Sequence, residues 1–525
     1  MEKFFNNAGP TIPADHYHID PLTRINWEDI LQLIAQKRYF LLHAPRQTGK
    51  TSTLLAMMHA LNAQGQFACA YANIEGAQTA RNDVERGVDA VCSSISSHID
   101  TYLPGTELGK WYYSSGRDVS SNDRLRVLLQ HWTTAASKPT ILFLDEVDAL
   151  VGDTLISLLR QIRAGYAQRP ESFPQSLILC GVRDIQDYRI HSSNQEIITG
   201  GSAFNIKAES LRMGNFSPEE CRTLLLQHTE ATGQSFQEAI FPLLWEDTEG
   251  QPWLVNALAY ELTWRIKALR DRSIPITVEH YMQAREELIQ SRATHLDQLV
   301  DKLKEERVHR VISAILSGEE EPSFRGADLD YVYDLGLIQK KPSVRIANRI
   351  YMETIPRELT WAKQVGIANQ DTGWYVAADG SLNMPKLLRA FQQFFRMNAE
   401  SWDQRFDYRE AGPQLLLQAF LQRIINGGGR IHREYALGRR RTDLLIEWPT
   451  TEKAYFGAVQ RIVIETKILR KSLESTIEEG VNQTKAYGQK AGAEDLHLII
   501  FDRSDRPWEE KIAERMIDNV GIWLC

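Results

Sequence analysis

The chain has 525 residues, 24% of them charged and 43% hydrophobic, and its formal net charge is −8. This length predicts roughly two to four domains with ample core. The acidic balance excludes a protein coated with basic residues, so any nucleic-acid surface must be a local patch. The five cysteines lack C-x-x-C spacing, and no apolar run is long enough to span a bilayer. We therefore expect a cytoplasmic protein without a zinc site or a membrane segment.

The first chemical signal lies at residues 39–52, where an apolar run of strand length leads into a polar loop and then a helix. The loop fits the P-loop pattern G-x-x-x-x-G-K-[ST], except that alanine replaces the first glycine. Such a loop directs backbone N–H groups toward a polyphosphate, and a chance turn is the alternative. We expect Lys50 to reach the β- and γ-phosphates of ATP and the Thr51 hydroxyl to bind Mg²⁺. The expected nucleotide-binding residues are Ala44, Pro45, Arg46, Gln47, Thr48, Gly49, Lys50, Thr51 and Ser52.

A second signal lies at residues 141–148, where four apolar residues run into the acids Asp145, Glu146 and Asp148. The pattern predicts a strand buried on both faces, whose carboxyl end opens at the ligand edge of a parallel sheet. Together with the upstream loop it is typical of a Walker B strand. Asp145 would hold Mg²⁺ and Glu146 would polarise the attacking water. A strand that merely ends in an acidic turn is the alternative.

Two further features concern the same site. Residues 177–184 predict another strand, at whose tip Arg183 or Asp184 would sense the nucleotide, with a surface salt bridge as the alternative. Arg160 and Arg163 share one face of a predicted helix. Either could be an arginine finger acting on a neighbouring subunit of a homo-oligomer, and solvated arginines are the simpler interpretation.

The order of these motifs resembles P-loop ATPases of the AAA-like or STAND-like kind. The resemblance implies an α/β fold with a parallel P-loop sheet, a helical lid and a winged helix. Ser217 and Pro218 predict the start of a lid helix. Residues 250–252, Gly-Gln-Pro, resemble the lid motif of that family, and an ordinary turn between helices is the alternative.

The middle of the chain predicts helices followed by a hairpin, with a return strand at residues 344–351. This outline is that of a winged helix, and the family resemblance points the same way. Acidic residues at 328, 330 and 334 disfavour strong phosphate contact. We therefore expect this segment to relay motion and not to bind DNA.

The C-terminal part predicts strands near residues 431–437, 442–447 and 462–467. Asp443 begins one of them, and Glu465 and Lys467 lie two apart on another, where they share a face. Paired carboxylates bind Mg²⁺ or Mn²⁺, which activates water for phosphodiester hydrolysis. Lys467 would orient or deprotonate that water, or neutralise the scissile phosphate.

This arrangement resembles the PD-(D/E)XK nuclease superfamily, with Thr442 in place of the proline-like residue. Gln483 and Tyr487, four residues apart on a predicted helix, match the Gln-x-x-x-Tyr motif of the RecB-like branch. Glu410 lies on a preceding predicted helix, where the superfamily often has a further carboxylate around the metal. The alternative is a small α/β domain with surface charges. Residues 496–501 predict the closing core strand of this C-terminal domain.

Basic residues cluster in sequence around these carboxylates, and a site for a polyanion needs such a rim. The alternative is ion pairing with the glutamates of the following helix. The six residues of this rim are Arg439, Arg440, Arg441, Arg461, Arg470 and Lys471.

The sequence therefore predicts an AAA-like core at 1–210, a lid at 211–285, a winged-helix-like segment at 286–358, a connector at 359–384 and a nuclease domain at 385–525. The expected function is an ATP-regulated, Mg²⁺-dependent DNA nuclease in prokaryotic defence or repair, with RNA as an open alternative substrate. The rivals are a STAND-like switch whose nuclease is released by a trigger, and a DNA-binding ATPase that does not cleave.

Overall fold

The structure is a computed structural model. It describes residues 2–182, 189–191, 197–199, 206–290, 301–317, 325–355, 375–403, 417, 420–421, 430–433, 444–450, 458–469, 472–502, 504 and 506–525. The chain forms two compact units, Met1–Leu288 with Asp334–Gly336, and Ile289–Tyr333 with Leu337–Cys525. Among the described helices, none combines the length and apolar character that crossing a bilayer requires.

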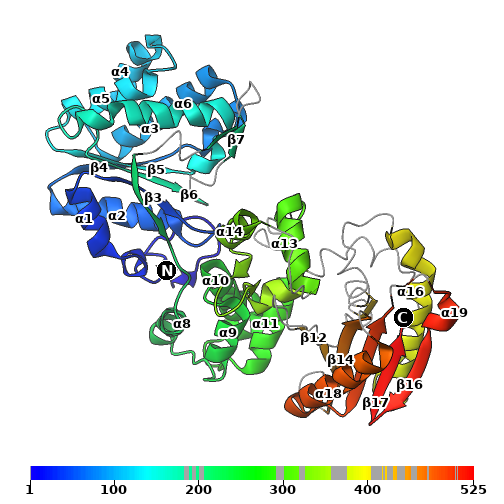
Figure 1. The fold of residues 1–525 in the computed structure, drawn as a ribbon. Helices are drawn as coiled ribbons and strands as arrows, with labels where there is room; N and C mark the ends of the chain where they lie inside the picture. Colours follow the sequence, from blue (N-terminus) through cyan, green and yellow to red (C-terminus); the bar gives the residue numbers. More distant parts are fainter. Residues whose placement is uncertain are drawn as a thin grey trace. The chain divides into compact units, whose positions relative to one another are not determined.

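A five-stranded parallel sheet in the order β4-β5-β6-β3-β9 forms the centre of the first unit (Figure 1). Its strands are β3 (Tyr39–His43), β4 (Ala68–Asn73), β5 (Thr140–Asp145), β6 (Ser176–Gly181) and β9 (Lys207–Arg212). All residues of β3, β5 and β6 are buried, as apolar runs covered on both faces require. Because the strands are parallel, the loops after β3 and β5 leave from the same edge.

Helices cover both faces of this sheet (Figure 1). Phe40 and Leu42 pack with α1 (Trp27–Ala35) and α2 (Lys50–Gln64). The alternate residues Tyr39 and Leu41 belong to the core on the other side. That core is shared with α3 (Val84–Tyr102), α5 (Arg124–Ala135) and α6 (Gly152–Gly165). The period-two alternation of the strand thus feeds two cores at once.

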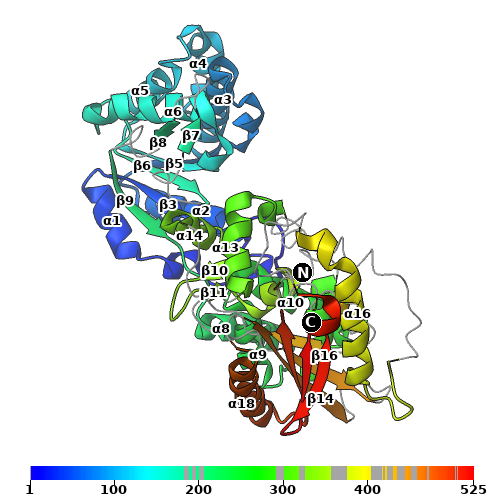
Figure 2. The same cartoon turned by 45° about the vertical axis from the view of Figure 1, so that its right-hand side comes forward.

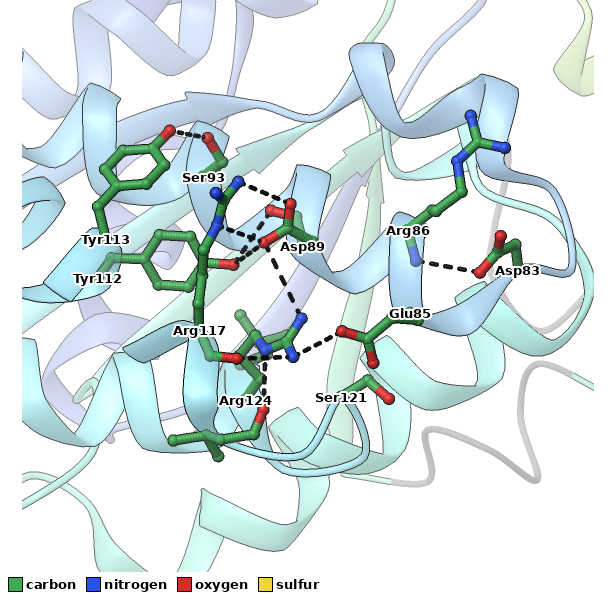
Figure 3. A network of polar contacts seen from close by, with 12 residues as sticks. Asp83, Glu85, Arg86, Asp89, Ser93, Tyr112, Tyr113, Arg117, Ser121 and Arg124 are labelled. Atoms are coloured by element: carbon green, nitrogen blue, oxygen red, sulfur yellow. Dashed lines mark hydrogen bonds and ion pairs between the residues drawn. The ribbon is translucent and has the colours of Figure 1, made fainter. Parts of the chain in front are cut away.

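A polar network fixes the connection between α3 and α5, which contains α4 (Leu108–Ser114) and η3 (Gly116–Asp118) (Figure 3). The Asp89 carboxylate accepts hydrogen bonds from the Tyr112 hydroxyl at 2.7 Å and from the Arg117 guanidinium at 2.9 and 3.0 Å. The buried Arg124 donates to the backbone carbonyls of Arg117 and Val119, at 2.9 Å each. Charge-assisted bonds therefore hold this layer to α3.

The rest of the first unit consists largely of helices. Ser217 and Glu220 form a complete capping box at the start of α8 (Pro218–Thr232), which confirms the predicted helix start. Gly250 has φ +68° and Pro252 begins α10 (Pro252–Tyr260), as expected from the lid sequence. Helix α9 (Ile240–Thr248) lies between α8 and α10 in sequence, and α11 (Val278–Gln290) follows α10. The N-terminal strands β1 (Phe4–Phe5) and β2 (His16–Tyr17) form a short parallel pair that contacts α10 and α8.

The middle of the chain contains α13 (Glu306–Ser317), α14 (Gly326–Asp334) and an antiparallel pair, β10 (Ile338–Gln339) and β11 (Arg345–Ile346). The predicted return strand at 344–351 is only partly right, because β11 ends at Ile346 and residues 349–355 are helical. The Asn348 side chain accepts a hydrogen bond from the Tyr351 backbone N–H at 2.9 Å. This cap ends the extended segment and starts the helix.

The second unit contains a six-stranded mixed sheet in the order β12-β13-β14-β15-β17-β16. Helix α18 (Leu473–Ala491) packs on one face of this sheet and α16 (Met384–Asp403) on the other (Figure 2). The strands are β12 (Arg430–Arg433), β13 (Leu444–Pro449), β14 (Val459–Ile468), β15 (Asp495–Phe501), β16 (Ala513–Ile517) and β17 (Val520–Leu524).

The expectation that residues 496–501 close this domain is wrong. β15 lies inside the sheet, between β14 and β17, and two further strands follow it in sequence. The edge strand β16 is mostly exposed, so it lacks the apolar run by which a buried strand is recognised.

The network of Figure 3 leads to a prediction about stability. Arg124 also donates to Glu85 at 2.7 Å, so Arg124→Ala leaves a carboxylate and two carbonyls without this donor. We expect the free energy of unfolding of the first unit to fall by about 2–4 kcal/mol in urea titrations. Arg126→Ala is the control, because Arg126 pairs with the partly exposed Asp123 within one helical turn. It should cost about 0.5 kcal/mol, and equal losses would contradict the assignment.

Candidate functional site

The P-loop connects β3 to α2 with two residues in the left-handed region, Gln47 at φ +56° and Gly49 at φ +92°. A Cβ at Gly49 would lie 2.9 Å from the Arg24 guanidinium, so the position favours glycine sterically as well. Ala44 is fully buried and has no positive φ. The backbone therefore accepts alanine where the P-loop pattern has its first glycine.

The structure brings the predicted Walker A and Walker B residues together. The Lys50 ammonium donates to the carbonyl oxygens of Ala44 and Pro45, at 3.1 Å each. The Thr51 hydroxyl donates to Oδ2 of Asp145 at 2.7 Å. Since Lys50 and Thr51 open α2, the first backbone N–H groups of that helix lie at the same point.

Asp145 is the most deeply buried acid of this site, with no exposed surface. Its Oδ2 also accepts from the Tyr71 hydroxyl at 3.0 Å, and its Oδ1 accepts from the backbone N–H of Glu146 at 2.9 Å. Glu146 itself has φ +58°. Burial, and after it the charge of Asp148, raises the pKa of Glu146 to about 7. A carboxyl with this pKa is suited to exchange a proton with water near neutral pH.

The donor set at this edge is made of oxygen atoms. The Thr51 hydroxyl and the Asp145 carboxylate are hard ligands of the kind that Mg²⁺ prefers. Mg²⁺ at nucleotide sites keeps several waters and takes other ligands from phosphate oxygens, so a pair of protein oxygens is sufficient. The residues present therefore fit a magnesium–triphosphate group.

A cavity of about 110 Å³ lies beside the P-loop, and residues of the N-terminal segment, the P-loop, α8 and α10 line it. The indole N–H of Trp253 donates to the Asn7 carbonyl at 2.8 Å. The backbone N–H of Thr11 donates to the Ser52 hydroxyl at 3.0 Å. The chain before the P-loop is thus tied to both α10 and α2. Gly49 and Ser52 are among the residues that line the cavity.

Sequence reasoning missed two residues of this site. Arg24 donates to the carbonyls of Thr48 and Gly214, at 2.7 Å each, and lies over the Phe216 ring at 4.7 Å. Burial lowers the pKa of Arg24 to about 10. It joins the P-loop to the segment that leads into α8. Tyr71, the other residue, could have been noticed as the phenol within the apolar run of β4.

Three other features of the first unit were predicted from the sequence. Arg160 and Arg163 are exposed on α6. Arg183 and Asp184 lie outside the described residues. The lid motif does approach the P-loop, because the Gln251 side-chain amide lies 3.5 Å from the Gln47 carbonyl oxygen.

A charged cluster adjoins the start of the P-loop. Asp334 Oδ1 lies 4.0 Å from His43 Nδ1 and 3.8 Å from Arg212 Nε, and both basic residues end strands of the parallel sheet. Two residues later, Gly336 has φ +78°, and a Cβ there would lie 2.7 Å from a ring carbon of Pro45. The turn 334–336 therefore packs directly on the P-loop.

In the second unit, the structure brings Glu465, Lys467 and Gln483 together. Lys467 Nζ lies 3.1 Å from Glu465 Oε1 and 3.8 Å from Glu479 Oε1, and it donates to the Gln483 side chain. The Glu465 carboxylate has no exposed surface, and neither oxygen forms a hydrogen bond with the described residues. Tyr487 is half-buried one helical turn beyond Gln483.

Asp443 and Glu410 lie outside the described residues. Within the described ranges, no three acidic, histidine or cysteine side chains converge as a metal site would require. Asp443 directly precedes Leu444 in the sequence, and the register pairs Leu444 with Ile464, the neighbour of Glu465. Of the six predicted rim residues, Arg461 is the one described, and it pairs with Glu447 at 3.2 Å.

Comparisons with known proteins concern the first part of the chain. The sequence matches the family described as "AAA-like domain" over residues 24–353, well over half of its length. No curated protein matches it significantly.

Solved structures that are similar to this chain include the following three. The Walker-type ATPase PABY2304 of Pyrococcus abyssi has 15% identity and a TM-score of 0.44, covering 67% of this chain and 99% of its own. Cdc6p from Pyrobaculum aerophilum has 17% identity and a TM-score of 0.35, covering 64% and 95%. The RuvB Holliday junction branch migration motor of Thermotoga maritima has 12% identity and a TM-score of 0.33, covering 63% and 94%.

The raised pKa of Glu146 gives a pH-dependent prediction for the nucleotide-free protein in EDTA. Between about pH 4.5 and pH 7 the folded protein keeps the Glu146 proton, which the unfolded chain has lost. Protonation of Glu146 therefore stabilises the folded protein at low pH, and this stabilisation is lost as the pH rises through 7. Glu146→Gln removes the buried charge. We expect it to stabilise the protein by about 1–2 kcal/mol at pH 8 and by nothing below pH 4.5, measured by urea titration. The exposed Glu230→Gln should shift neither curve, and a gain for Glu146→Gln that is independent of pH would refute the assignment.

Proposed function

The chain belongs to the AAA-like family of P-loop ATPases, and on that premise we propose that ATP binding controls a Mg²⁺-dependent DNA nuclease formed by the C-terminal sheet. The ATPase residues are those at the carboxyl edge of the parallel sheet. Lys50 would bind the phosphates, Thr51 and Asp145 would hold Mg²⁺, and Glu146 would orient the attacking water. The finer division into core, lid, winged-helix-like segment, connector and nuclease domain remains a prediction.

One observation carries the nuclease proposal, the environment of the Glu465 carboxylate. Buried carboxylates normally accept several hydrogen bonds, and this one is accompanied among the described residues by the Lys467 ammonium. Burying a charge without hydrogen bonds is costly, and a single ammonium offsets only part of that cost. A divalent metal, held with Asp443 and with Glu410 as an additional carboxylate, would supply a further cationic partner.

The chemistry follows from what these side chains can do. A metal at Glu465 would polarise the scissile phosphate and acidify a bound water. Lys467 lies next to the carboxylate and can orient the water or neutralise the phosphate. Water attacks phosphorus, the bond to the leaving oxygen breaks, and that oxygen takes up a proton. Gln483, which accepts from Lys467, keeps the ammonium on the face of the sheet covered by α18.

The turn 334–336 supports nucleotide control. These residues group with the first unit, whereas the residues on both sides of them in sequence group with the second. Asp334 contacts His43 and Arg212, and Gly336 packs on Pro45 of the P-loop. A change of the P-loop on binding ATP would therefore act on a turn that is covalently continuous with α14 and β10.

The nuclease proposal is tested with Glu465→Gln in the full-length protein. We expect cleavage of plasmid and linear DNA in Mg²⁺ and ATP to fall about 100-fold or more, because a metal ligand is lost, while ATP hydrolysis is retained. Glu447→Gln is the matched control on the neighbouring strand, and it should cut like the parent. Lys50→Ala should lose both ATP hydrolysis and the ATP dependence of cleavage. Undiminished cutting by Glu465→Gln would refute the nuclease, and tight ATP retention with little turnover would favour a switch.

Nucleotide control is tested separately at the turn. Asp334→Asn weakens the contacts with His43 and Arg212, so the ratio of DNA cleavage with ATP to cleavage without ATP should fall about fivefold or more. Asp330→Asn is the control, because Asp330 lies on the same helix and pairs with Lys340. Both variants should keep the parent's affinity for ATP. An unchanged ratio in Asp334→Asn would show that control does not pass through this turn.

A further inference from the structure

Tyr71 lies on β4, the edge strand beside the Walker B strand β5, and is 5% exposed. Its hydroxyl donates to Oδ2 of Asp145 at 3.0 Å, the same oxygen that accepts from Thr51 at 2.7 Å. The register pairs Tyr71 with Phe143 and Asn73 with Asp145, so the phenol reaches the carboxylate diagonally across the two strands. No P-loop or Walker B pattern includes this residue.

The ring of Tyr71 is held so that this contact is maintained. It packs edge-to-face against His98 and Tyr102, with ring centroids 6.1 Å away in each case. A tyrosine hydroxyl is protonated at neutral pH, so toward the Asp145 carboxylate it can only donate.

The three groups that donate hydrogen bonds to Asp145 differ in the oxygen that they contact and in their expected role at the metal site. The backbone N–H of Glu146 holds Oδ1, and Thr51 and Tyr71 both hold Oδ2. Thr51 is expected to bind Mg²⁺ through its hydroxyl oxygen, so its hydroxyl has to serve two partners. The Tyr71 hydroxyl, by contrast, is not expected to bind Mg²⁺. It can fix the plane of the carboxylate whether or not the metal is bound.

We propose that Tyr71 is a positioning residue that presets Asp145 for the Mg²⁺ of the bound nucleotide. This inference rests on the proposed Mg²⁺ site of the ATPase. Without the phenol hydroxyl, the fully buried carboxylate keeps one side-chain donor on Oδ2 and can turn toward it. Mg²⁺ would then have to order the carboxylate on binding, and its apparent affinity falls.

The alternative is that the Tyr71 hydroxyl serves stability alone. The two roles differ in one measurable respect, the dependence of nucleotide binding on Mg²⁺. ATP without metal would be held by Lys50 and by the backbone of the P-loop, whereas the Tyr71 hydroxyl donates to Asp145. A stabilising role would change unfolding without changing the Mg²⁺ dependence.

The experiment compares the full-length parent with Tyr71→Phe and Tyr39→Phe. Tyr39 is a matched control, since it is fully buried in β3 of the same sheet and its hydroxyl donates at 2.8 Å to the Pro174 carbonyl. Binding of a fluorescent ATP analogue is titrated at increasing Mg²⁺, starting from EDTA, and thermal unfolding is recorded with ATP in EDTA and with ATP in Mg²⁺.

We expect Tyr71→Phe to bind the analogue in EDTA like the parent, and to need about tenfold more Mg²⁺ for half-maximal tightening. The extra thermal stabilisation that Mg²⁺ adds to ATP should shrink in parallel, and Tyr39→Phe should match the parent in both Mg²⁺ readouts. A Mg²⁺ curve of Tyr71→Phe that superimposes on the parent's, or lies at lower Mg²⁺, would overturn the positioning role. If Mg²⁺ does not tighten binding in the parent, the proposed metal site itself fails.

Discussion

The hydrogen bond from the Thr51 hydroxyl to the Asp145 carboxylate is the contact on which the ATPase half of this protein depends. It joins the first turn of α2 to the end of β5, and it is possible because β3 and β5 run parallel with β6 between them, so that both strands deliver their loops to one edge. The carboxylate is completely buried, and three donors hold it. In the neighbouring Glu146, burial and the charge of Asp148 raise the pKa to about 7. One strand end thus presents two acids of different character.

The second unit also contains a buried carboxylate, that of Glu465, but its surroundings differ from those of Asp145. Glu465 and Lys467 lie on one face of β14 because side chains alternate along a strand, and α18 closes over them. Among the described residues, this buried carboxylate lies 3.1 Å from the Lys467 ammonium, and neither of its oxygens accepts a hydrogen bond. A buried charge with so few partners has a high electrostatic cost. That cost is the physical reason for the metal site that we propose in this sheet.

The short turn at 334–336 is the contact through which we propose that nucleotide control passes. It belongs to the first unit although the residues on either side belong to the second. A glycine with φ +78° lets the turn approach Pro45 closely, and a carboxylate holds it to two basic residues at strand ends. Packed contacts of this kind change between discrete arrangements, so under the proposed nucleotide control a shift in the P-loop would be transmitted through this turn.

The sequence by itself determined the features that depend on residues close together in the chain. The apolar runs of β3 and β5, the Gly-Lys-Thr turn, the capping box before α8 and the shared face of Glu465 and Lys467 all follow from neighbours in the chain. Tertiary structure alone decided the rest. It placed Arg24 on the P-loop, Tyr71 on Asp145 and Asp334 beside His43, contacts between segments far apart in sequence. It also added the edge strands β9 and β16, whose polar residues carry no strand signal, because an edge strand is defined by the partner it pairs with and only weakly by its own composition.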